Sequence, residues 1–363
     1  MNSLNLDKFR NPELIKKIVN NIHRLADKPV NIMEVCGTHT MAIAKFGIRG
    51  LLPSSINLIS GPGCPVCVTP VENIDTIIEI SKITNTILVS FGDMLKVPGS
   101  KSTLEKARGE GGDIRIIYSP LELLELAETN PGKNIVFAGV GFETTSPTIA
   151  AIVIRAKKEK IKNLFILTAF KVIPPALKFI AAQKTLNING FLLPGHVSAI
   201  IGSGPYEFLS EEHGISGVIS GFEPVDILYS IYLILKQVKT NHPKIEIQYS
   251  RTIRPEGNTK ARVLLNEVFE DSTSMWRAIG EIPGSGLIFN KDYYEFSSQA
   301  RFNIKTGKSK GPKNCLCGKI LMGLKTPKEC LLFGNICTPQ NAIGPCMVSS
   351  EGTCAAYYKY QIG

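Results

Sequence analysis

The chain has 363 residues, of which 44% are hydrophobic and 20% charged, a composition typical of a folded globular protein with two or three domains. Its net charge is +10, but the basic residues are dispersed and no stacking aromatics alternate with lysines, which disfavours nucleic acid as a partner. The clearest basic enrichment runs from Arg301 to Lys328. No apolar run reaches the roughly 18 to 20 residues that cross a bilayer, and no secretory signal opens the chain. We therefore expect a cytoplasmic protein without a membrane partner.

The first predicted element is a helix over 12–25, where apolar residues recur on one helical face. After it, a β-rich apolar run, a glycine or polar turn and a helical pattern repeat with the spacing of βαβ units, roughly 25 to 30 residues. Strands that are apolar throughout and alternate with helices predict parallel sheets covered on both faces. The eight runs are Val30–Val35, Ile56–Ser60, Thr86–Ser90, Ile114–Tyr118, Asn134–Ala138, Leu164–Thr168, Gly190–Leu193 and Gly217–Ser220.

Two doubly wound α/β domains are the preferred fold for these eight runs. The alternative is a closed (β/α)₈ barrel, which eight units would also fit in number. The turn Asn130-Pro131-Gly132 falls halfway along the repeats and marks a boundary. The predicted domains are therefore 30–130, which carries the N-terminal cysteines, and 131–243.

The regular alternation of strands and helices ends at Lys244. A short alternating strand (245–250) and a helical pattern (260–270) are followed by loops rich in glycine and proline, and then by a cysteine cluster. We expect 244–363 to form a third domain that carries the cluster, packed with 1–29.

The unusual motifs of the sequence all follow predicted strands, which is where ligands of open parallel sheets bind. The first half contains CGTH, GPGCPVC and FGD, and the second half contains GFETT, PGHVS and GFEP. The triplet Gly-Phe-Glu occurs twice, so the motifs could build two halves of one cleft. Its candidate acid–base groups are Asp93, Glu143, His196 and Glu223, although each could equally cap a helix or occupy a turn.

Cys36 and His39 lie three residues apart at the first strand end. If a helix begins at Gly37, both side chains point to one spot near its N-terminus, where unpaired N–H groups lower a thiol pKa. A thiolate with an imidazole suits Fe(II) or Zn(II). The alternative is a buried thiol beside a histidine that makes a local hydrogen bond.

The second strand end carries Cys64-Pro65-Val66-Cys67, a CxxC motif. In a reducing compartment such a motif is either a dithiol–disulfide couple or half of a metal site. No second half lies nearby in the sequence, so the redox interpretation is preferred. Two incidental small apolar side chains are the alternative.

Six of the nine cysteines lie near the C-terminus, after a long cysteine-free stretch. Their spacing, C-x14-C-x6-C-x16-C when counted from Cys315, lacks the CxxC knuckles of a zinc ribbon. Four thiolates gathered from loops suit a [4Fe–4S] cubane, with zinc as the alternative, and Cys346 is interpreted as a packed spectator. The predicted ligands are Cys315 or Cys317, Cys330, Cys337 and Cys354.

Taken together, CGTH, GPGCPVC, GFETT, PGHVSA, GFEPVDIL and CTPxxxxGxCMVSSEGTCAAYY resemble the motifs of the HypD family of hydrogenase maturation proteins. The resemblance runs from about Glu34 to Tyr360, with the motifs in the same order. It implies two α/β domains and a third that holds a [4Fe–4S] cluster. It also implies a scaffold on which the iron of [NiFe]-hydrogenases receives two cyanides and one carbon monoxide.

The same resemblance implies two partners, the small chaperone HypC and the cyanide donor HypE. By motif, Cys36 would hold the iron together with the chaperone's N-terminal cysteine, and His39 would assist or ligate. The Cys64–Cys67 dithiol would lie next to the cluster, as in ferredoxin:thioredoxin reductase, and would reduce a thiocyanate-like adduct during cyanide transfer. The cluster ligands that it implies are Cys330, Cys337, Cys354 and either Cys315 or Cys317.

Two other functions fit the residues less closely. One is a free-standing iron–sulfur disulfide reductase that uses the CxxC motif, and the other is a zinc-stabilised binding module. Neither GxGxxG nor GxxxxGK[ST] follows a strand, so any use of ATP is expected to belong to a partner.

Overall fold

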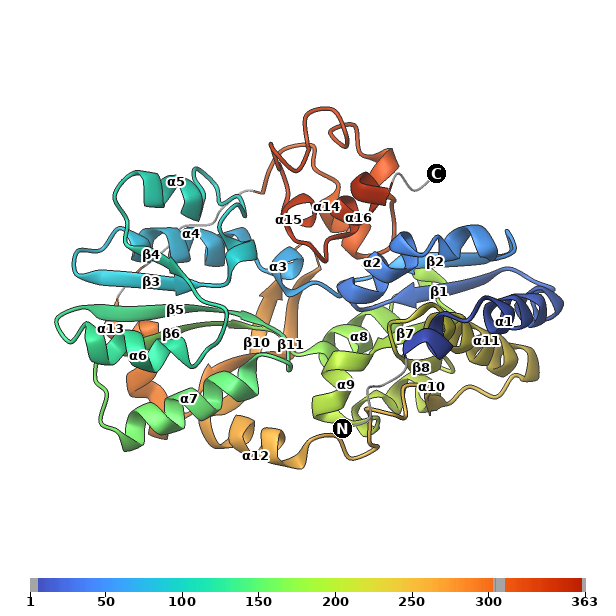
Figure 1. Cartoon of the computed structure of the whole chain (residues 1–363), viewed down its shortest axis with the longest axis horizontal. Helices are drawn as coiled ribbons and strands as arrows, with labels where there is room; N and C mark the ends of the chain where they lie inside the picture. Colours follow the sequence, from blue (N-terminus) through green and yellow to red (C-terminus); the bar gives the residue numbers. More distant parts are fainter. Residues whose placement is uncertain (1–5, 278, 303, 305–310, 361–363) are drawn as a thin grey trace.

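The computed structural model describes residues 6–277, 279–302, 304 and 311–360 (Figure 1). Its strands are β1 (Val30–Glu34), β2 (Ile56–Ser60), β3 (Thr86–Ser90), β4 (Ile114–Ile116), β5 (Asn134–Gly141), β6 (Leu164–Phe170), β7 (Gly190–Pro194), β8 (Ser216–Ser220), β9 (Ile245–Ile247), β10 (Phe269–Trp276) and β11 (Gly280–Phe289). Its α-helices are α1 (Pro12–Leu25), α2 (Gly37–Lys45), α3 (Pro65–Val68), α4 (Val71–Ser81), α5 (Leu104–Gly109), α6 (Glu122–Thr129), α7 (Ser146–Lys158), α8 (Ile173–Ala181), α9 (Gly195–Ile201), α10 (Phe208–Glu211), α11 (Pro224–Thr240), α12 (Thr259–Val268), α13 (Ser298–Arg301), α14 (Cys317–Leu321), α15 (Pro345–Val348) and α16 (Thr353–Tyr360). No helix in these ranges is both long and apolar enough to cross a membrane.

Two open parallel sheets form the body of the molecule, on the right and the left of Figure 1. The first sheet has the order β2-β1-β7-β8-β9, and the second has the order β4-β3-β5-β6. Every residue of β3 and of β8 is buried, as expected for strands covered on both faces. The predicted parallel α/β class is confirmed, and the closed-barrel alternative is wrong.

The sheets divide the chain at other points than the predicted boundaries. The chain leaves the first sheet after β2, builds the whole second sheet, and returns with β7 to complete the first. The turn at 130–132 therefore lies between strands of one sheet, and β3 pairs with β5 across it. Strand β9 pairs with β8, so the first sheet extends beyond Lys244. Local apolarity shows where strands lie but does not indicate which strands pair.

Helix α1 covers the predicted range but packs on the first sheet rather than on the C-terminal region. It lies against α11, and the buried Ile18 and Ile22 belong to the apolar core that lines that face of the sheet. Its amphipathic stripe explains both the helix and its location, because a single apolar face needs one apolar partner.

A two-stranded antiparallel hairpin, β10–β11, occupies a stretch where only loops are expected from the sequence. Its glycines and a proline resemble loop composition, and a bulge near Ser274 interrupts the alternation of buried and exposed residues. The hairpin lies beside the end of β6, where Lys171 bridges to Gly286, and its tip carries the fully buried Trp276 (Figure 1). It joins the second sheet to the region of the CxxC motif.

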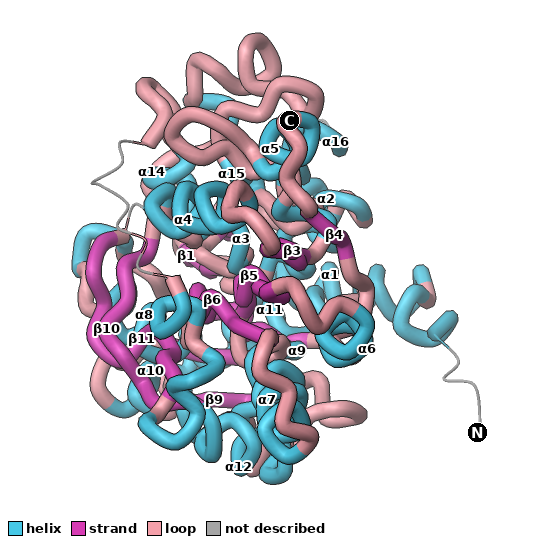
Figure 2. The backbone as a smooth tube through the Cα atoms, turned by 90° about the vertical axis from the view of Figure 1, so that its left-hand side faces the viewer, coloured by secondary structure: helices cyan, strands magenta, loops and turns pink. Residues whose placement is uncertain are grey.

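The residues from 311 to 360 form a small lobe of loops and short helices above the two sheets (Figures 1 and 2). Helix α16 packs on α2 of the first sheet, and α15 packs on α3. The lobe therefore covers the motifs that follow β1 and β2.

Lys171 gives a first testable prediction, because it is a lysine with only 2% of its surface exposed. Burial lowers its pKa from 10.5 to about 8, while its ammonium donates to Ser274 Oγ. Between those two pH values the unfolded chain binds more protons than the folded chain, so folding stability rises with pH in that window. We expect a gain of up to about 3 kcal/mol.

Lys171→Met should remove that gain, because the variant has no proton to release. The measurement is the difference between the urea-unfolding free energies of wild type and variant from pH 8 to 10.5. Parallel curves for the two proteins would show that the buried ammonium does not titrate in this range.

Candidate functional site

Cys36 lies where β1 passes into α2, and it occupies the N-cap position of that helix. The loop after β2 packs directly on it, because a Cβ at Gly63 would lie 2.3 Å from the Cys36 backbone nitrogen. The Gly37 amide also donates to the Gly63 carbonyl at 2.9 Å. The CGTH and GPGCPVC motifs are therefore in backbone contact, as adjacent parallel strands predict.

The Cys36 thiol is buried, and its pKa is raised to about 11. Burial is the largest cause and the charge of Glu351 adds to it, while the amides of His39 and Thr38 at the helix N-terminus oppose it. The sequence predicted that the helix N-terminus would lower this pKa. That prediction is wrong for the chain alone, because burial outweighs the two amides.

Glu351 is the functional residue that the sequence analysis missed. It comes from the C-terminal lobe, and its Oε1 accepts a hydrogen bond from the Thr38 hydroxyl at 2.7 Å. Gly37 makes room for it, since a Cβ there would lie 2.4 Å from Glu351 Cβ. Burial raises the pKa of Asp93 and the charge of Glu351 adds to that rise, whereas burial lowers the pKa of His196 and the charge of Glu351 opposes that fall. The one acidic residue inside the CMVSSEGTC motif was the available signal.

The contact of Thr38 with Glu351 gives a second prediction. Thr38→Val removes a hydrogen bond to a charged group and should lower the free energy of unfolding by about 1.5 to 3 kcal/mol. Thr38→Ser keeps the hydroxyl and is the matched control, for which we expect a loss of less than half that size. Urea-unfolding midpoints check the pair. Equal losses in the two variants would show that the hydroxyl contributes no more to stability than the methyl group that Thr38→Ser removes.

His39 is fully buried and faces the end of β8. Its Nε2 lies 3.0 Å from the Gly221 carbonyl, and burial lowers its pKa to about 4, so the ring is neutral at pH 7 and donates this bond. Phe222 lies against the His39 ring, at 4.7 Å between centroids, and stacks on His196 at 4.1 Å. The histidine thus ties the CGTH motif to the second Gly-Phe-Glu motif, while its Nδ1 has no hydrogen-bond partner among the described residues.

The predicted acid–base residues have different environments. Asp93 and His196 are exposed and lie in electrostatic range of Glu351. Glu143 is buried, with its pKa raised to about 7 by burial, and its Oε1 accepts from the Ile173 amide at the first residue of α8. Glu223 caps α11 and forms an ion pair with Arg10. The helix-cap alternative therefore describes Glu143 and Glu223.

The CxxC motif forms the short helix α3, with Cys64 as its N-cap. The Cys67 amide donates to Cys64 Sγ at 3.2 Å, and the Cys64 thiol donates to Ser349 Oγ at 3.3 Å. Cys67 is fully buried, and its thiol lies within interaction range of the Cys346 thiol, since α15 packs on α3. The two thiols are therefore close together and in contact with the C-terminal lobe.

All five predicted cluster cysteines line one small cavity in the C-terminal lobe, together with Cys346. Gly344 permits the approach of Cys315, since a Cβ there would lie 2.9 Å from its sulfur. Cys317 Sγ lies 2.8 Å from Cys346 Sγ, and each of the nine cysteines is a free thiol. Cys346 is buried, with Cys317 on one side and Cys67 on the other.

The donor set of this cavity fits an iron–sulfur cluster in chemistry and number. Its polar lining consists of thiols, and its other walls are apolar or glycine: Ile320, Leu332, Phe333, Gly344 and Met347. Such walls exclude water and oxygen ligands, which soft thiolate ligation requires. No group of three or more His, Cys, Asp or Glu side chains in the described ranges is placed to hold a single metal ion. A cubane instead takes its ligands from around a cage.

The whole chain matches one family of known proteins. The family model HypD, described as "Hydrogenase formation hypA family", matches residues 13–361. The chain belongs to the HypD family. The predicted family is thereby confirmed over nearly the full length.

Relatives of known name are similar over almost their whole length. A putative hydrogenase expression/formation protein of Methanocaldococcus jannaschii is 43% identical, covering 96% of this chain and 97% of that protein. The hydrogenase maturation factor HypD of Escherichia coli is 40% identical, covering 98% of both chains. HypD2 of Bradyrhizobium diazoefficiens is also 40% identical, covering 98% of this chain and 96% of that protein.

Proposed function

We propose that this HypD-family chain is a hydrogenase maturation factor that serves as the scaffold for assembly of the Fe(CN)₂CO group. In this proposal a cluster and a dithiol of the same chain supply the electrons. One observation carries the proposal: a continuous line of four thiols, Cys64, Cys67, Cys346 and Cys317, joins the strand-end motifs to the cysteine-lined cavity.

The geometry favours one set of four ligands for a [4Fe–4S] cluster. Cys317 is engaged with Cys346 at 2.8 Å, in the direction of the CxxC helix. Cys315 lies against the cavity beside Gly344, and its thiol neighbour is Cys317 rather than Cys346. We therefore assign the cluster to Cys315, Cys330, Cys337 and Cys354. When bound, the cluster would supply electrons one at a time.

The Cys64–Cys67 dithiol, at one end of this series of thiols, would act as the two-electron donor. Oxidation of the two thiols to one disulfide releases two electrons and two protons. The same two electrons and two protons convert a thiocyanate-like adduct on a HypE-like partner into a thiol and hydrogen cyanide. Cys36 would hold the iron cargo, together with a cysteine of a HypC-like chaperone, because a soft thiolate suits iron that carries cyanide. The neutral His39 would position the CGTH motif.

Anaerobic purification with iron and sulfide counts tests the cluster. We expect about four of each in wild type and in Cys317→Ala, and a loss of both in Cys315→Ala. A colourless protein that contains zinc and no iron would contradict the proposal. The opposite result for the two variants would exchange the roles of Cys315 and Cys317.

Infrared spectroscopy tests the scaffold. The chain purified with its HypC-like partner should show cyanide and carbonyl stretches that are absent from Cys36→Ala. The alternative is a free-standing iron–sulfur disulfide reductase. It would be favoured if the protein, purified from cells that make active hydrogenase, showed neither band but reduced disulfides in protein substrates.

A further inference from the structure

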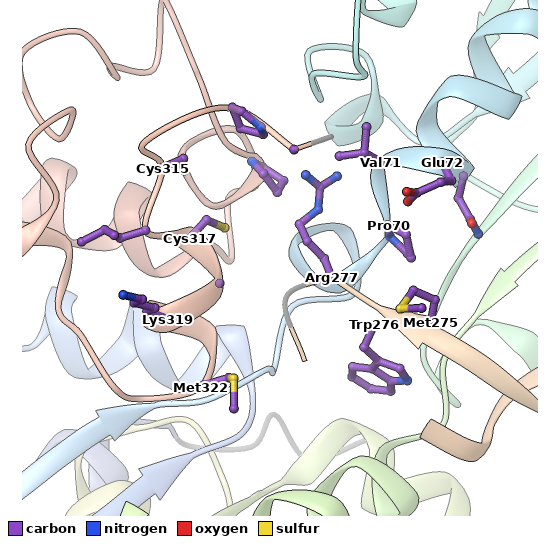
Figure 3. A pocket seen from close by; sticks show the side chains of 16 residues that line it. Pro70, Val71, Glu72, Met275, Trp276, Arg277, Cys315, Cys317, Lys319 and Met322 are labelled. Carbon is purple, nitrogen blue, oxygen red and sulfur yellow. The ribbon is translucent and has the colours of Figure 1, made fainter. Parts of the chain in front are cut away.

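A second and larger cavity, of about 670 Å³, borders the cysteine-lined cavity (Figure 3). Cys315 and Cys317 line both cavities, so here the proposed cluster site adjoins space that is open to solvent. Its remaining lining comes from the segment after the CxxC helix, from the hairpin tip with Met275 and Arg277, and from the C-terminal lobe with Pro312 and Lys319.

Arg277 lies between Cys315 and Cys317 on one side and Pro70 and Val71 on the other (Figure 3). Its backbone amide donates to the Val68 carbonyl and its Nε to the Thr69 carbonyl, both at 2.7 Å. Its Nη2 is buried and has no hydrogen-bond partner in the part of the chain that the structure describes. The guanidinium is therefore held in place by the two carbonyls at the end of α3.

The sequence that precedes and enters the C-terminal cysteine cluster is strongly basic. Residues 301–328 contain eight lysines and arginines and no acidic residue. Among the described residues of this stretch, Lys319 lies exposed on the cavity wall and Lys313 is exposed next to the lining residue Pro312. The wall also presents an exposed apolar side chain, Met275, with 48% of its surface accessible.

We propose that this cavity is the docking site for an acidic one-electron carrier protein that reduces the cluster. Carboxylates of the carrier would meet the exposed Lys319 and Lys313, and an apolar edge would cover Met275. A cation-rimmed, partly apolar surface next to a redox centre recognises such a partner, because charge complementarity brings the carrier to its target and orients it. The inference rests on the proposed function, since it requires a cluster at the adjoining cysteines.

The electron balance is simple. The reduced carrier would give up one electron in each event, a cluster held by Cys315, Cys330, Cys337 and Cys354 would accept it, and no atom would be transferred. Two such events, with two protons from solvent, return one Cys64–Cys67 disulfide to the dithiol. Docking at this cavity therefore restores the reducing equivalents that the proposed cyanide transfer consumes.

Stopped-flow kinetics under anaerobic conditions test the docking site. The reductant is an acidic [2Fe–2S] ferredoxin, and the readout is the second-order rate constant of cluster reduction at low and high salt. Lys319→Glu should lower this constant about 10-fold at low salt, with the difference shrinking as salt rises. Lys313→Glu, which lies outside α14, should act in the same direction. Lys260→Glu on α12, an exposed lysine away from the cavity, is the matched control and should change the constant by about twofold or less.

The outcomes separate the docking site from the cluster itself. Iron counts and complete reduction by excess dithionite must show an intact cluster in each variant. If wild type itself contains no cluster, the proposed function is wrong, and this result is distinct from a failure of the docking site. The docking site is wrong if the Lys319→Glu and Lys313→Glu variants contain the cluster and ferredoxin reduces it as fast as it does in wild type. Equal slowing by Lys260→Glu would also overturn it, since net charge alone would then explain the effect. If competing single-stranded DNA blocks reduction while excess acidic ferredoxin does not relieve the block, the cavity is a nucleic-acid site instead.

Discussion

Gly63→Ala is expected to damage both the fold and the function of this protein. The added Cβ would lie 2.3 Å from the Cys36 nitrogen and 2.5 Å from its Cα, which are backbone atoms that cannot rotate away. Overpacking of this kind costs about 1 to 3 kcal/mol or more of folding stability. It also moves the CxxC loop away from Cys36, and a displacement of about 1 Å between reacting groups can cost roughly 100-fold in rate.

Two measurements check this prediction. One is the urea midpoint of the purified protein, and the other is hydrogenase activity in a strain that depends on this chain for maturation. The control is Gly132→Ala, because a Cβ at that exposed turn meets nothing within 4 Å. Wild-type stability and activity in Gly63→Ala would show that the two motifs do not need their backbone contact.

Cys346→Ala is expected to separate the cluster from the dithiol. None of the four assigned cluster ligands is removed, so iron and sulfide counts should stay at the wild-type level. The thiol that contacts both Cys67 and Cys317 is lost, however, and with it the line between the two redox groups. Residues that hydrogen-bond to metal ligands without binding the metal typically change activity about 10- to 100-fold when mutated, so we expect hydrogenase activity in the maturation assay to fall by roughly 10- to 100-fold.

The readout is the number of free thiols that appear at Cys64 and Cys67 after the oxidised protein receives electrons through its cluster. Met347→Leu tests packing alone, because it changes the neighbouring buried side chain of the same cavity at nearly constant volume. Normal dithiol recovery in Cys346→Ala would show that electrons reach Cys67 by another route.

Strand positions were predicted well from the sequence because each strand is a short apolar run. β2 and β3 begin and end at the predicted residues, and the other predicted strands overlap their runs. The pairing of those strands was not predictable in the same way. A return to the first sheet after four strands of the second depends on contacts far apart in the sequence. The hairpin β10–β11 was missed because its glycines and bulge hide the alternation that identifies a strand.

The chemistry-bearing residues were found by residue type, and their roles required the structure. The convergence of the C-terminal cysteines on one cavity agrees with their spacing. The contacts of Cys346 depend on α15 lying against α3, which no local pattern encodes. Glu351 is distant in sequence from Thr38, and only the packing of the C-terminal lobe on α2 brings them together. Burial reversed the expected direction of the Cys36 pKa, because desolvation depends on the completed fold.

The return of the chain to its first sheet has a consequence for biosynthesis. As the protein leaves the ribosome, β1 and β2 emerge early but lack their partners β7, β8 and β9 until residue 247 has been made. The second sheet, from β3 to β6, is continuous in sequence and can therefore complete its strand pairing first. The carbonyl that His39 contacts, at Gly221, belongs to the late-arriving part. A nascent or truncated chain thus contains Cys36 without its finished surroundings, and only the full-length protein can bring its three cysteine groups together.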